Sequence, residues 1–284
     1  MIRRLLGLLG LLTVLSNCTT PDPAVSAAPF TAMTFNIRYG TAQDGADAWH
    51  LRRDMLAKRI AEADPAILAV QEALAAQLQF LEQCLPNHVR IGQGRDGGEK
   101  GEHAALFLDR RRFRVLDCGD FWLSETPQVV ASVGWDAALT RLCTWARVQD
   151  TTTSRTLTVW NAHFDHRGAI ARLHSAELLA QKIAATSGPN LLLGDFNTGE
   201  QSAPLSTLRA AGLRDTFRDA NPAAAAVGTF HAFKGGTSGD KIDYILTNQG
   251  LVTRSAAILS QPGANGCWPS DHHPVVASLS FSME

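Results

Sequence analysis

Short apolar runs of strand length recur along the whole chain, and polar residues suited to catalysis follow most of them. The run at 33–35 ends at Asn36, and the run at 191–193 is followed closely by Asp195. Apolar runs of about four to eight residues bounded by turn residues indicate buried strands. Because the ends of neighbouring strands meet along one edge of a sheet, side chains from distant parts of the chain can meet there. The pattern therefore predicts sheets with one polar rim.

Helical periodicity alternates with these runs. At 52–63 the apolar residues Met55, Leu56 and Ile60 fall on one face of a helix. Further helices are predicted at 75–85 and 169–185. Strands are predicted at 30–37, 66–70, 103–108, 113–116, 142–148, 156–162, 189–193, 241–246, 253–259 and 274–281. Strands and helices mixed in this way predict an α/β fold of layered sheets with helices outside.

The composition is that of a globular protein with a large core. The chain has 284 residues, of which 45% are hydrophobic and 19% are charged. Single sandwiches and barrels of about 200–250 residues are common. No repeat, low-complexity block or linker divides the chain after residue 30, so we predict a single domain at 30–284.

The N-terminal segment has the pattern of a bacterial export signal. Arg3 and Arg4 precede an apolar run at 5–15, which is too short to span a bilayer. We predict a signal peptide at 1–17, lipidation of Cys18, and a flexible tether at 18–29 that is rich in Thr, Pro, Ala and Ser. The protein would then be a periplasmic or outer-membrane lipoprotein. Ordinary signal cleavage, which would leave a secreted protein, is the alternative.

The charge balance argues against a dedicated duplex-binding protein. The formal net charge is −1, and removal of 1–17 takes away two arginines and no acid, which leaves −3. Proteins that bind duplexes usually carry a basic surplus, because phosphate contacts supply most of their affinity. The nearest basic run, at 110–114, is interpreted as a solvated turn.

The polar residues at the predicted rim are of two chemical kinds. Asp, Glu and Asn offer oxygen ligands, which suit Mg²⁺ or Mn²⁺ better than zinc. Histidines such as His163 and His272 can act as general acids or bases near neutral pH. No spacing of cysteines and histidines indicates a zinc site.

Each of these motifs, taken alone, also has an ordinary structural interpretation. Residues 194–197 could be an Asx turn after a strand, and 270–274 could be a capped loop. His163 could be a loop histidine. The joint occurrence of the motifs in a fixed order indicates a catalytic site.

That order resembles the endonuclease/exonuclease/phosphatase superfamily. The matching segments are Phe35-Asn36-Ile37-Arg38, Gln71-Glu72, Asn161-Ala162-His163, Gly194-Asp195-Phe196-Asn197, Ile242-Asp243-Tyr244 and Ser270-Asp271-His272. The resemblance covers 30–281 and implies a four-layer α/β sandwich, with two mostly antiparallel sheets packed face to face and helices outside. It also implies that 30–284 is a catalytic domain with its site at one rim.

The resemblance assigns a role to each matching position. The implied metal ligands are Asn36, Glu72 and Asp271, for Mg²⁺ or Mn²⁺. The implied catalytic residues are His163, Asp195, Asn197, Asp243 and His272, with Asp243 orienting His272. The implied phosphate contacts are Asn36, Arg141 and Asn197. Glu102 resembles an acid that pairs with the first histidine, His163.

The segment 163–168, together with 121–127 and 134–136, resembles a bacterial exported branch related to the deadenylase-like group. Asp165, His166 and Arg167 would lie beside His163 and could contact substrate, with Asp165 in a supporting role. A helix N-terminal cap is the alternative role for Asp165. The tryptophans of 121–127 and 134–136 are interpreted as core, and a wall on which substrate stacks is the alternative.

These features predict an exported, metal-dependent phosphoester hydrolase in which water attacks phosphorus. The substrate class stays open between nucleic acid, phospholipid head groups and small phosphate esters, and the protein is expected to be a monomer. A non-catalytic exported binding protein on the same fold is the alternative. It is disfavoured because every motif residue is present.

Overall fold

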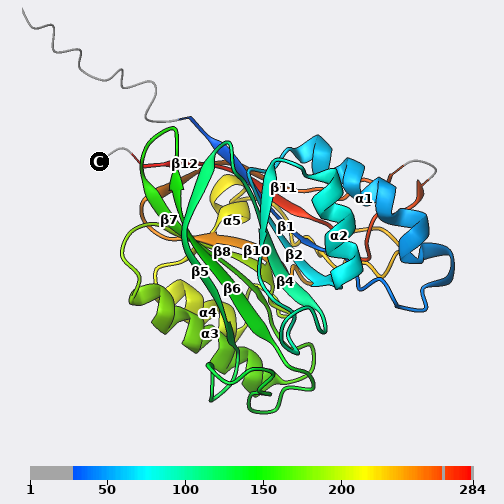
Figure 1. Ribbon diagram of the computed structural model, residues 1–284, viewed down its shortest axis with the longest axis horizontal. Helices are drawn as coiled ribbons and strands as arrows, with labels where there is room; N and C mark the ends of the chain where they lie inside the picture. The colour runs from blue at the N-terminus through cyan, green and yellow to red at the C-terminus, as the bar shows by residue number, and fades with distance from the viewer. Residues whose placement is uncertain (1–27, 264–265, 283–284) are drawn as a thin grey trace, which may run out of the picture.

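Two six-stranded sheets packed face to face form the centre of the computed structural model, which describes residues 28–263 and 266–282 (Figure 1). The first sheet has the order β11-β12-β1-β2-β4-β3 and the second has the order β5-β6-β7-β8-β10-β9. The strands of the first sheet are β1 (Phe30–Asn36), β2 (Ile67–Ala73), β3 (His88–Ile91), β4 (His103–Asp109), β11 (Leu251–Ile258) and β12 (Val275–Phe281). Those of the second are β5 (Phe113–Trp122), β6 (Leu142–Asp150), β7 (Thr156–His163), β8 (Asn190–Asp195), β9 (Arg214–Asp215) and β10 (Asp243–Thr247).

Both sheets are mostly antiparallel. Each contains one parallel pair, β1 with β2 in the first sheet and β7 with β8 in the second. A helix lies in each of these two parallel connections, as parallel crossovers require. The helices are α1 (Trp49–Ala63), α2 (Ala75–Cys84), α3 (Ala169–Ala184), α4 (Ala203–Ala210) and α5 (Thr216–Ala220), with a 3-10 turn, η2, at Gly45–Asp47.

Apolar side chains that point alternately to the two faces of each strand hold the four layers together. Leu191 and Leu193 of β8 face the first sheet, whereas Leu192 between them packs in the cluster that contains Leu179 of α3 and Leu208 of α4. On the other side of the molecule, apolar residues of α1 and α2 pack on β1 and β2. Successive side chains of a strand point to opposite faces, so each sheet packs on the other sheet with one face and on helices with the other. The predicted four-layer sandwich is confirmed.

Asn161 of β7 is a polar residue inside the contact between the two sheets. Its Nδ2 donates to the carbonyl oxygens of Val70 (3.0 Å) and Ala105 (2.8 Å), and its Oδ1 accepts from Gln71 Nε2 at 2.8 Å. All three partners belong to the first sheet. Asn161 therefore fixes how the two sheets sit against each other directly beneath the rim.

Most predicted elements agree with the structure to within a few residues, and the differences have physical causes. β5 extends to Trp122 rather than 116, because it is an edge strand whose middle residues are exposed and polar. β3, β9, α4 and α5 are short, and their sequences carry no clear period. The signal peptide, Cys18 and nearly all of the predicted tether lie outside the described residues. None of the helices described here combines the length and apolar character that a membrane crossing requires.

Candidate active site

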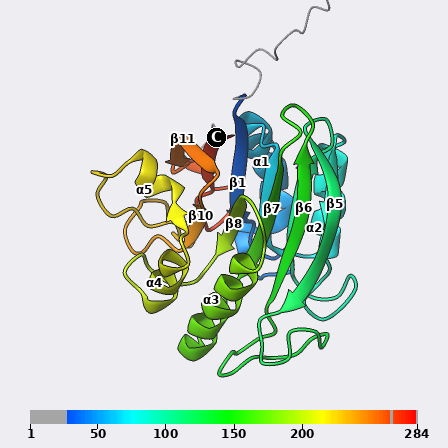
Figure 2. The same ribbon diagram turned by 90° about the vertical axis from the view of Figure 1, so that its left-hand side faces the viewer.

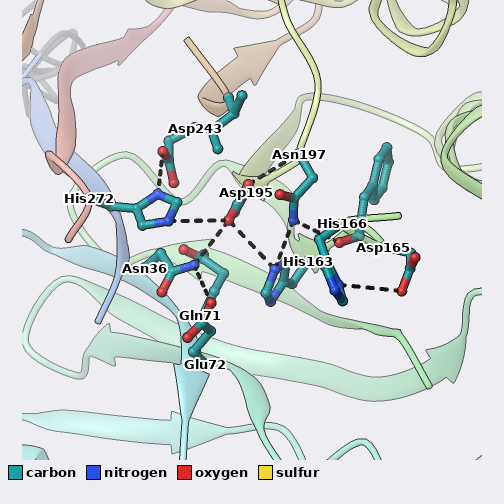
Figure 3. A network of polar contacts seen from close by, with 12 residues as sticks. Asn36, Gln71, Glu72, His163, Asp165, His166, Asp195, Asn197, Asp243 and His272 are labelled. Carbon is teal, nitrogen blue, oxygen red and sulfur yellow. Dashed lines mark hydrogen bonds and ion pairs between the residues drawn. The ribbon is translucent and has the colours of Figure 1, made fainter. Parts of the chain in front are cut away.

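A cleft of about 790 Å³ opens at the rim of the sandwich where β1, β2, β7 and β8 end. Figure 3 shows side chains from both sheets pointing toward Asp195, which lies at the centre of the polar network. The cleft brings together the predicted residues Glu72, Glu102, Arg141, His163, Asp195, Asn197, Asp271 and His272. Asn36 and Asp243 are bonded directly to members of this set.

Glu72 reaches the cleft because β2 is irregular at this point. The pairing of β2 with β4 shifts register between Val70 and Ala73, and Glu72 has a φ of 61°. A bulge re-aims a side chain, and a non-glycine residue in the left-handed region persists only where its surroundings hold it. Here Oε1 accepts from Asn36 Nδ2 at 3.1 Å and Oε2 accepts from Tyr39 N at 3.1 Å.

Asn36 connects the predicted metal ligands to the predicted catalytic carboxylate. Its Nδ2 donates to Glu72 and also to Asp195 Oδ2 at 3.0 Å, and its Oδ1 accepts from Arg38 N at 3.0 Å. Asp271 lies on the same side of the cleft and is buried. Burial, with the negative charge of Glu72 added, raises the pKa of Asp271.

The donor set fits a hard divalent cation. The negative charge of Glu72 acts on Asp271, whose Oδ2 lies 3.8 Å from Arg38 Nε, and a bound cation would offset the remaining repulsion between the two carboxylates. Asn36 is adjacent, although its oxygen already accepts from Arg38 N. The ligand atoms of Asp195, Asp243 and His272 also lie within 4.8 Å of one another.

Asp195 is a buried carboxylate held by two donors. Its Oδ1 accepts from Asn197 N at 2.9 Å, and its Oδ2 accepts from Asn36. Burial, with the negative charge of Asp243 added, raises the pKa of Asp195 to about 7. A carboxylate with such a pKa can take up a proton near neutral pH.

His272 and Asp243 form a buried imidazole–carboxylate pair. His272 Nδ1 lies 2.9 Å from Asp243 Oδ2, and His272 Nε2 points toward Asp195 Oδ2 at 3.9 Å. Burial would lower the pKa of His272, but the charge and hydrogen bond of Asp243 outweigh it and raise that pKa to about 10. His272 is therefore a cation at neutral pH, and its Nε2–H faces the cleft.

His163 has the opposite character. Its Nδ1 lies 2.9 Å from Arg141 Nη1, while its Nε2 lies 3.1 Å from Asn197 Nδ2 and 3.5 Å from Asp195 Oδ2. Burial, followed by the positive charge of Arg141, lowers the pKa of His163 well below its ordinary value. Arg141 Nη1 and Asn197 Nδ2 can only donate, so both ring nitrogens of a neutral His163 face donors, and the ring can accept from one of them.

Arg141 and Asp165 lie near His163. Arg141 was predicted as a phosphate contact and Asp165 as a support of His163 or a helix cap, and the structure shows the contacts that each of them makes. The buried guanidinium of Arg141 contacts His163, His166 Nδ1 at 3.1 Å and Asp165 Oδ2 at 3.5 Å. Asp165 Oδ1 accepts from the backbone N–H groups of 167 and 168, just before α3. Within α3 itself, the N–H groups of 170 and 171 are bonded to Asp136.

The predicted pairing of Glu102 with His163 is wrong. Glu102 lines the cleft but forms an ion pair with Arg95 at 2.8 Å. Arg141 occupies the position beside His163 Nδ1 that the acid would need. Because burial raises the pKa of Glu102 and Arg95 opposes that shift, the two residues stabilise each other as a pair.

Several residues of the cleft were not predicted, because they lie in loops without a strand-end pattern. They are Arg38 with its partner Asp44, Arg95, Phe230 and Phe233. The ring of Phe230 lies 5.0 Å from that of His272, and 47% of the residue is exposed. The segment 230–233, in which two phenylalanines enclose a histidine and an alanine, is the one sequence signal that could have indicated that this loop lines the cleft.

The family model described as the Endonuclease/Exonuclease/phosphatase family matches residues 33–272. The chain belongs to this family. Members of the family are phosphoester hydrolases that generally use divalent metals. No curated protein matches the chain at a significant level.

Solved structures of the family agree with this assignment. An endonuclease/exonuclease/phosphatase from Bacteroides vulgatus is 34% identical, with a TM-score of 0.84 over 90% of this chain and 100% of that one. A mannosyl-6-phosphatase from Bacteroides thetaiotaomicron is 32% identical, with a TM-score of 0.82 over 88% and 99%. The human nocturnin catalytic domain shares the fold at 18% identity, with a TM-score of 0.70 over 89% and 95%. The predicted likeness to the deadenylase-like group therefore holds at the level of the fold.

Proposed function

We propose that this protein is an exported, divalent-metal-dependent phosphatase that hydrolyses phosphate monoesters of small polyhydroxylated molecules. The observation that carries the chemistry is the arrangement around Asp195. A carboxylate with a pKa near neutrality lies between a cationic histidine and a carboxylate pair suited to a metal. A binding protein would have no need for this combination.

Different residues of the cleft accept the proton of the attacking water and stabilise the phosphoryl oxygens during an in-line attack on phosphorus. Asp195 Oδ2 accepts a proton from the attacking water, and the backbone N–H of Asn197 and the side chain of Asn36 hold the carboxylate in place. His272, kept cationic by Asp243, donates its Nε2–H to a phosphoryl oxygen on which negative charge grows. His163 lies on the other side of the phosphoryl group, where burial and the adjacent Arg141 keep its ring uncharged.

Glu72 and Asp271, with Asn36 beside them, would hold Mg²⁺ or Mn²⁺. When bound, the cation supplies Lewis-acid stabilisation of the phosphoryl oxygens and of the leaving oxygen. The protein's part is to keep these ligands fixed, through the bulge at Glu72 and through the bond from Ser270 Oγ to the carbonyl oxygen of Asn36 at 2.7 Å.

Three observations support a small, hydroxyl-rich leaving group. A mannosyl-6-phosphatase is among the similar structures. The walls of the cleft carry carboxylate–guanidinium pairs, Arg38 with Asp44 and Arg95 with Glu102, which can bind hydroxyl groups as donors and acceptors. The net charge of −1 provides no basic surface for a polyanion.

A panel of phosphoesters assayed with Mg²⁺ tests this assignment. We expect kcat/KM for mannose 6-phosphate to exceed that for bis(4-nitrophenyl) phosphate and for a single-stranded oligonucleotide by about a hundredfold or more, because polar subsites discriminate strongly. A phospholipid should be turned over no faster than the oligonucleotide. Faster hydrolysis of the oligonucleotide or of the phospholipid would contradict the assignment to small monoesters.

The N-terminal sequence supports export with lipidation of Cys18, because a basic start and a short apolar run precede that cysteine. Acyl chains contribute about 0.8 kcal/mol per buried methylene to membrane binding. We therefore expect the full-length protein in the membrane fraction of an exporting bacterium, and Cys18→Ser in the soluble fraction. Equal distribution of the two forms would favour ordinary signal cleavage.

A further inference from the structure

A second groove lies on the outer face of the second sheet, away from the catalytic cleft. It has a volume of about 610 Å³ and is lined by β5, β6 and β7 and by the C-terminal end of α3 with the turn after it. Figure 2 shows α3 running along this sheet, with β5 and β6 lying beyond it toward the edge. None of the residues that line this groove lines the catalytic cleft.

Two tryptophans form the floor of this groove. Trp145 of β6 is paired with Trp160 of β7, and their ring centroids are 6.0 Å apart. Trp160 is 5% exposed and its Nε1 donates to Asn190 Oδ1 at 2.9 Å, so it belongs to the core. Trp145 is only partly buried, and its Nε1–H has no acceptor among the residues that the structure describes.

Gly119 keeps one side of Trp145 open. Gly119 of β5 is the cross-strand partner of Trp145, and a Cβ atom at this position would lie 3.2 Å from Trp145 Nε1. Any larger residue on this edge strand would cover the indole. The partly exposed indole of Trp145 therefore lines the groove with no side chain from position 119 against its Nε1–H.

Polar groups of both charges surround this surface. Asp117 lies opposite Arg147, and Arg147 lies opposite Thr158, so the three form the next row of the sheet beside the tryptophans. Arg147 is exposed and has no ion-pair partner in the described part of the chain. Lys182 of α3 closes the groove, with its Nζ 4.3 Å from the centre of the Phe121 ring.

We propose that this groove is a carbohydrate-binding site. A pyranose ring has one apolar C–H face, which would pack on Trp145, and hydroxyl groups at its edge that both donate and accept hydrogen bonds. Asp117 can accept from such hydroxyls, and Arg147 and the Trp145 N–H can donate to them. A phosphate would gain nothing from Asp117, and a stacked nucleobase would leave this row of mixed donors and acceptors mostly unused.

The site is non-catalytic and independent of the proposed phosphatase activity. Asp117 and Asp120 line it, but none of its described lining residues is a histidine, and it lies on a sheet face rather than at strand ends. Its role is to hold a glycan on the protein surface while the cleft remains free. Carbohydrate binding can therefore be measured in a protein that is catalytically inactive, and each property can fail alone.

Titration followed through the indole N–H signals of the full protein tests the proposal. The chain has six tryptophans, and mannopentaose, cellopentaose and chitopentaose serve as probes, with AMP as the probe without an oligosaccharide. We expect at least one oligosaccharide to shift the Trp145 signal in a saturable way. Saturable shifts with AMP alone, or no shift with any of the three oligosaccharides, would overturn the proposal.

Two variants locate the binding. Trp145→Leu and Arg147→Ala should each weaken the affinity for that oligosaccharide by about tenfold or more, as truncation of a central aromatic or arginine contact usually does. Arg114→Ala, an arginine of the same sheet outside the groove, is the matched control and should bind normally. If Trp145→Leu fails to fold, Arg147→Ala decides the result, because Arg147 is exposed. Unchanged affinity in Arg147→Ala would then overturn the proposal.

Discussion

Replacing His272 with alanine is expected to lower kcat for a phosphate monoester by about 10²–10⁴-fold, as loss of a positioned acid–base group usually does. Asp243→Asn should cause a loss of the same order, because it removes the charge that keeps His272 cationic and leaves the shape of the side chain intact. His163→Ala should also fall in this range. Each kcat is to be measured at saturating substrate and metal, together with Tm.

The pairing of His272 with Asp243 makes a sharper test than the single variants. Residues that act as one unit are non-additive, so His272→Ala/Asp243→Asn should be scarcely slower than His272→Ala alone. A double variant slowed by the product of the two single effects would show that the residues act separately.

His273 is the matched control for this histidine. Its Nε2 lies 2.7 Å from the carbonyl oxygen of Gly236 and its ring stacks on His231, with ring centroids 4.1 Å apart, so it packs behind the wall of the cleft. His273→Ala should lower Tm but keep most of the kcat of the folded protein. An inactive, folded His273→Ala beside an active His272→Ala would reverse the roles of the two histidines.

Glu72→Gln is expected to lower kcat/KM with Mg²⁺ by about 10²–10³-fold, because metal stabilisation of the transition state is worth several kcal/mol. Excess chelator should abolish the activity of the unaltered protein. A second readout is Tm: a ligand at a hundred times its Kd stabilises the folded protein by about 2.7 kcal/mol. Mg²⁺ should therefore raise the Tm of the unaltered protein and hardly change that of Glu72→Gln.

The control for Glu72 is Glu62→Gln. Glu62 is an exposed acid of α1 that forms an ion pair with Lys58 at 3.1 Å and does not line the catalytic cleft. This variant should keep both the activity and the Mg²⁺-dependent rise in Tm. Full activity of the unaltered protein in chelator, or activity restored by zinc alone, would exclude the proposed magnesium site.

The site residues that lie at the ends of strands could be predicted from the sequence. Asn36, His163 and Asp195 end apolar runs whose period and length are visible in the chain, and parallel neighbours such as β1 and β2 bring such ends together. The layered fold followed from the same pattern, because runs buried on both faces must be covered by a second sheet or by helices.

Contacts between side chains could not be predicted in the same way. The partner of Glu102 depends on which arginine lies nearer, Arg141 or Arg95. Their positions depend on how the glycine-rich connection at 92–101, between β3 and β4, packs on the rim. The bulge at Glu72 is equally hidden, since nothing in Val70-Gln71-Glu72-Ala73 marks a change of register. Loop residues such as Phe230 follow no period, so their position depends on tertiary contacts alone.

The order of the strands determines how late in synthesis the proposed active site can form. The first sheet is made from both ends of the chain, β1 to β4 and then β11 and β12, whereas the second comes wholly from the middle. A growing polypeptide that has reached 250 already contains Glu72, His163 and Asp195, yet it lacks Asp271 and His272. These two residues directly precede β12, which pairs with β1, and pairing between segments so distant in sequence is among the slowest kinds to form. We therefore expect the proposed hydrolysis to require Asp271 and His272, and forms truncated before these residues should be inert toward phosphoesters.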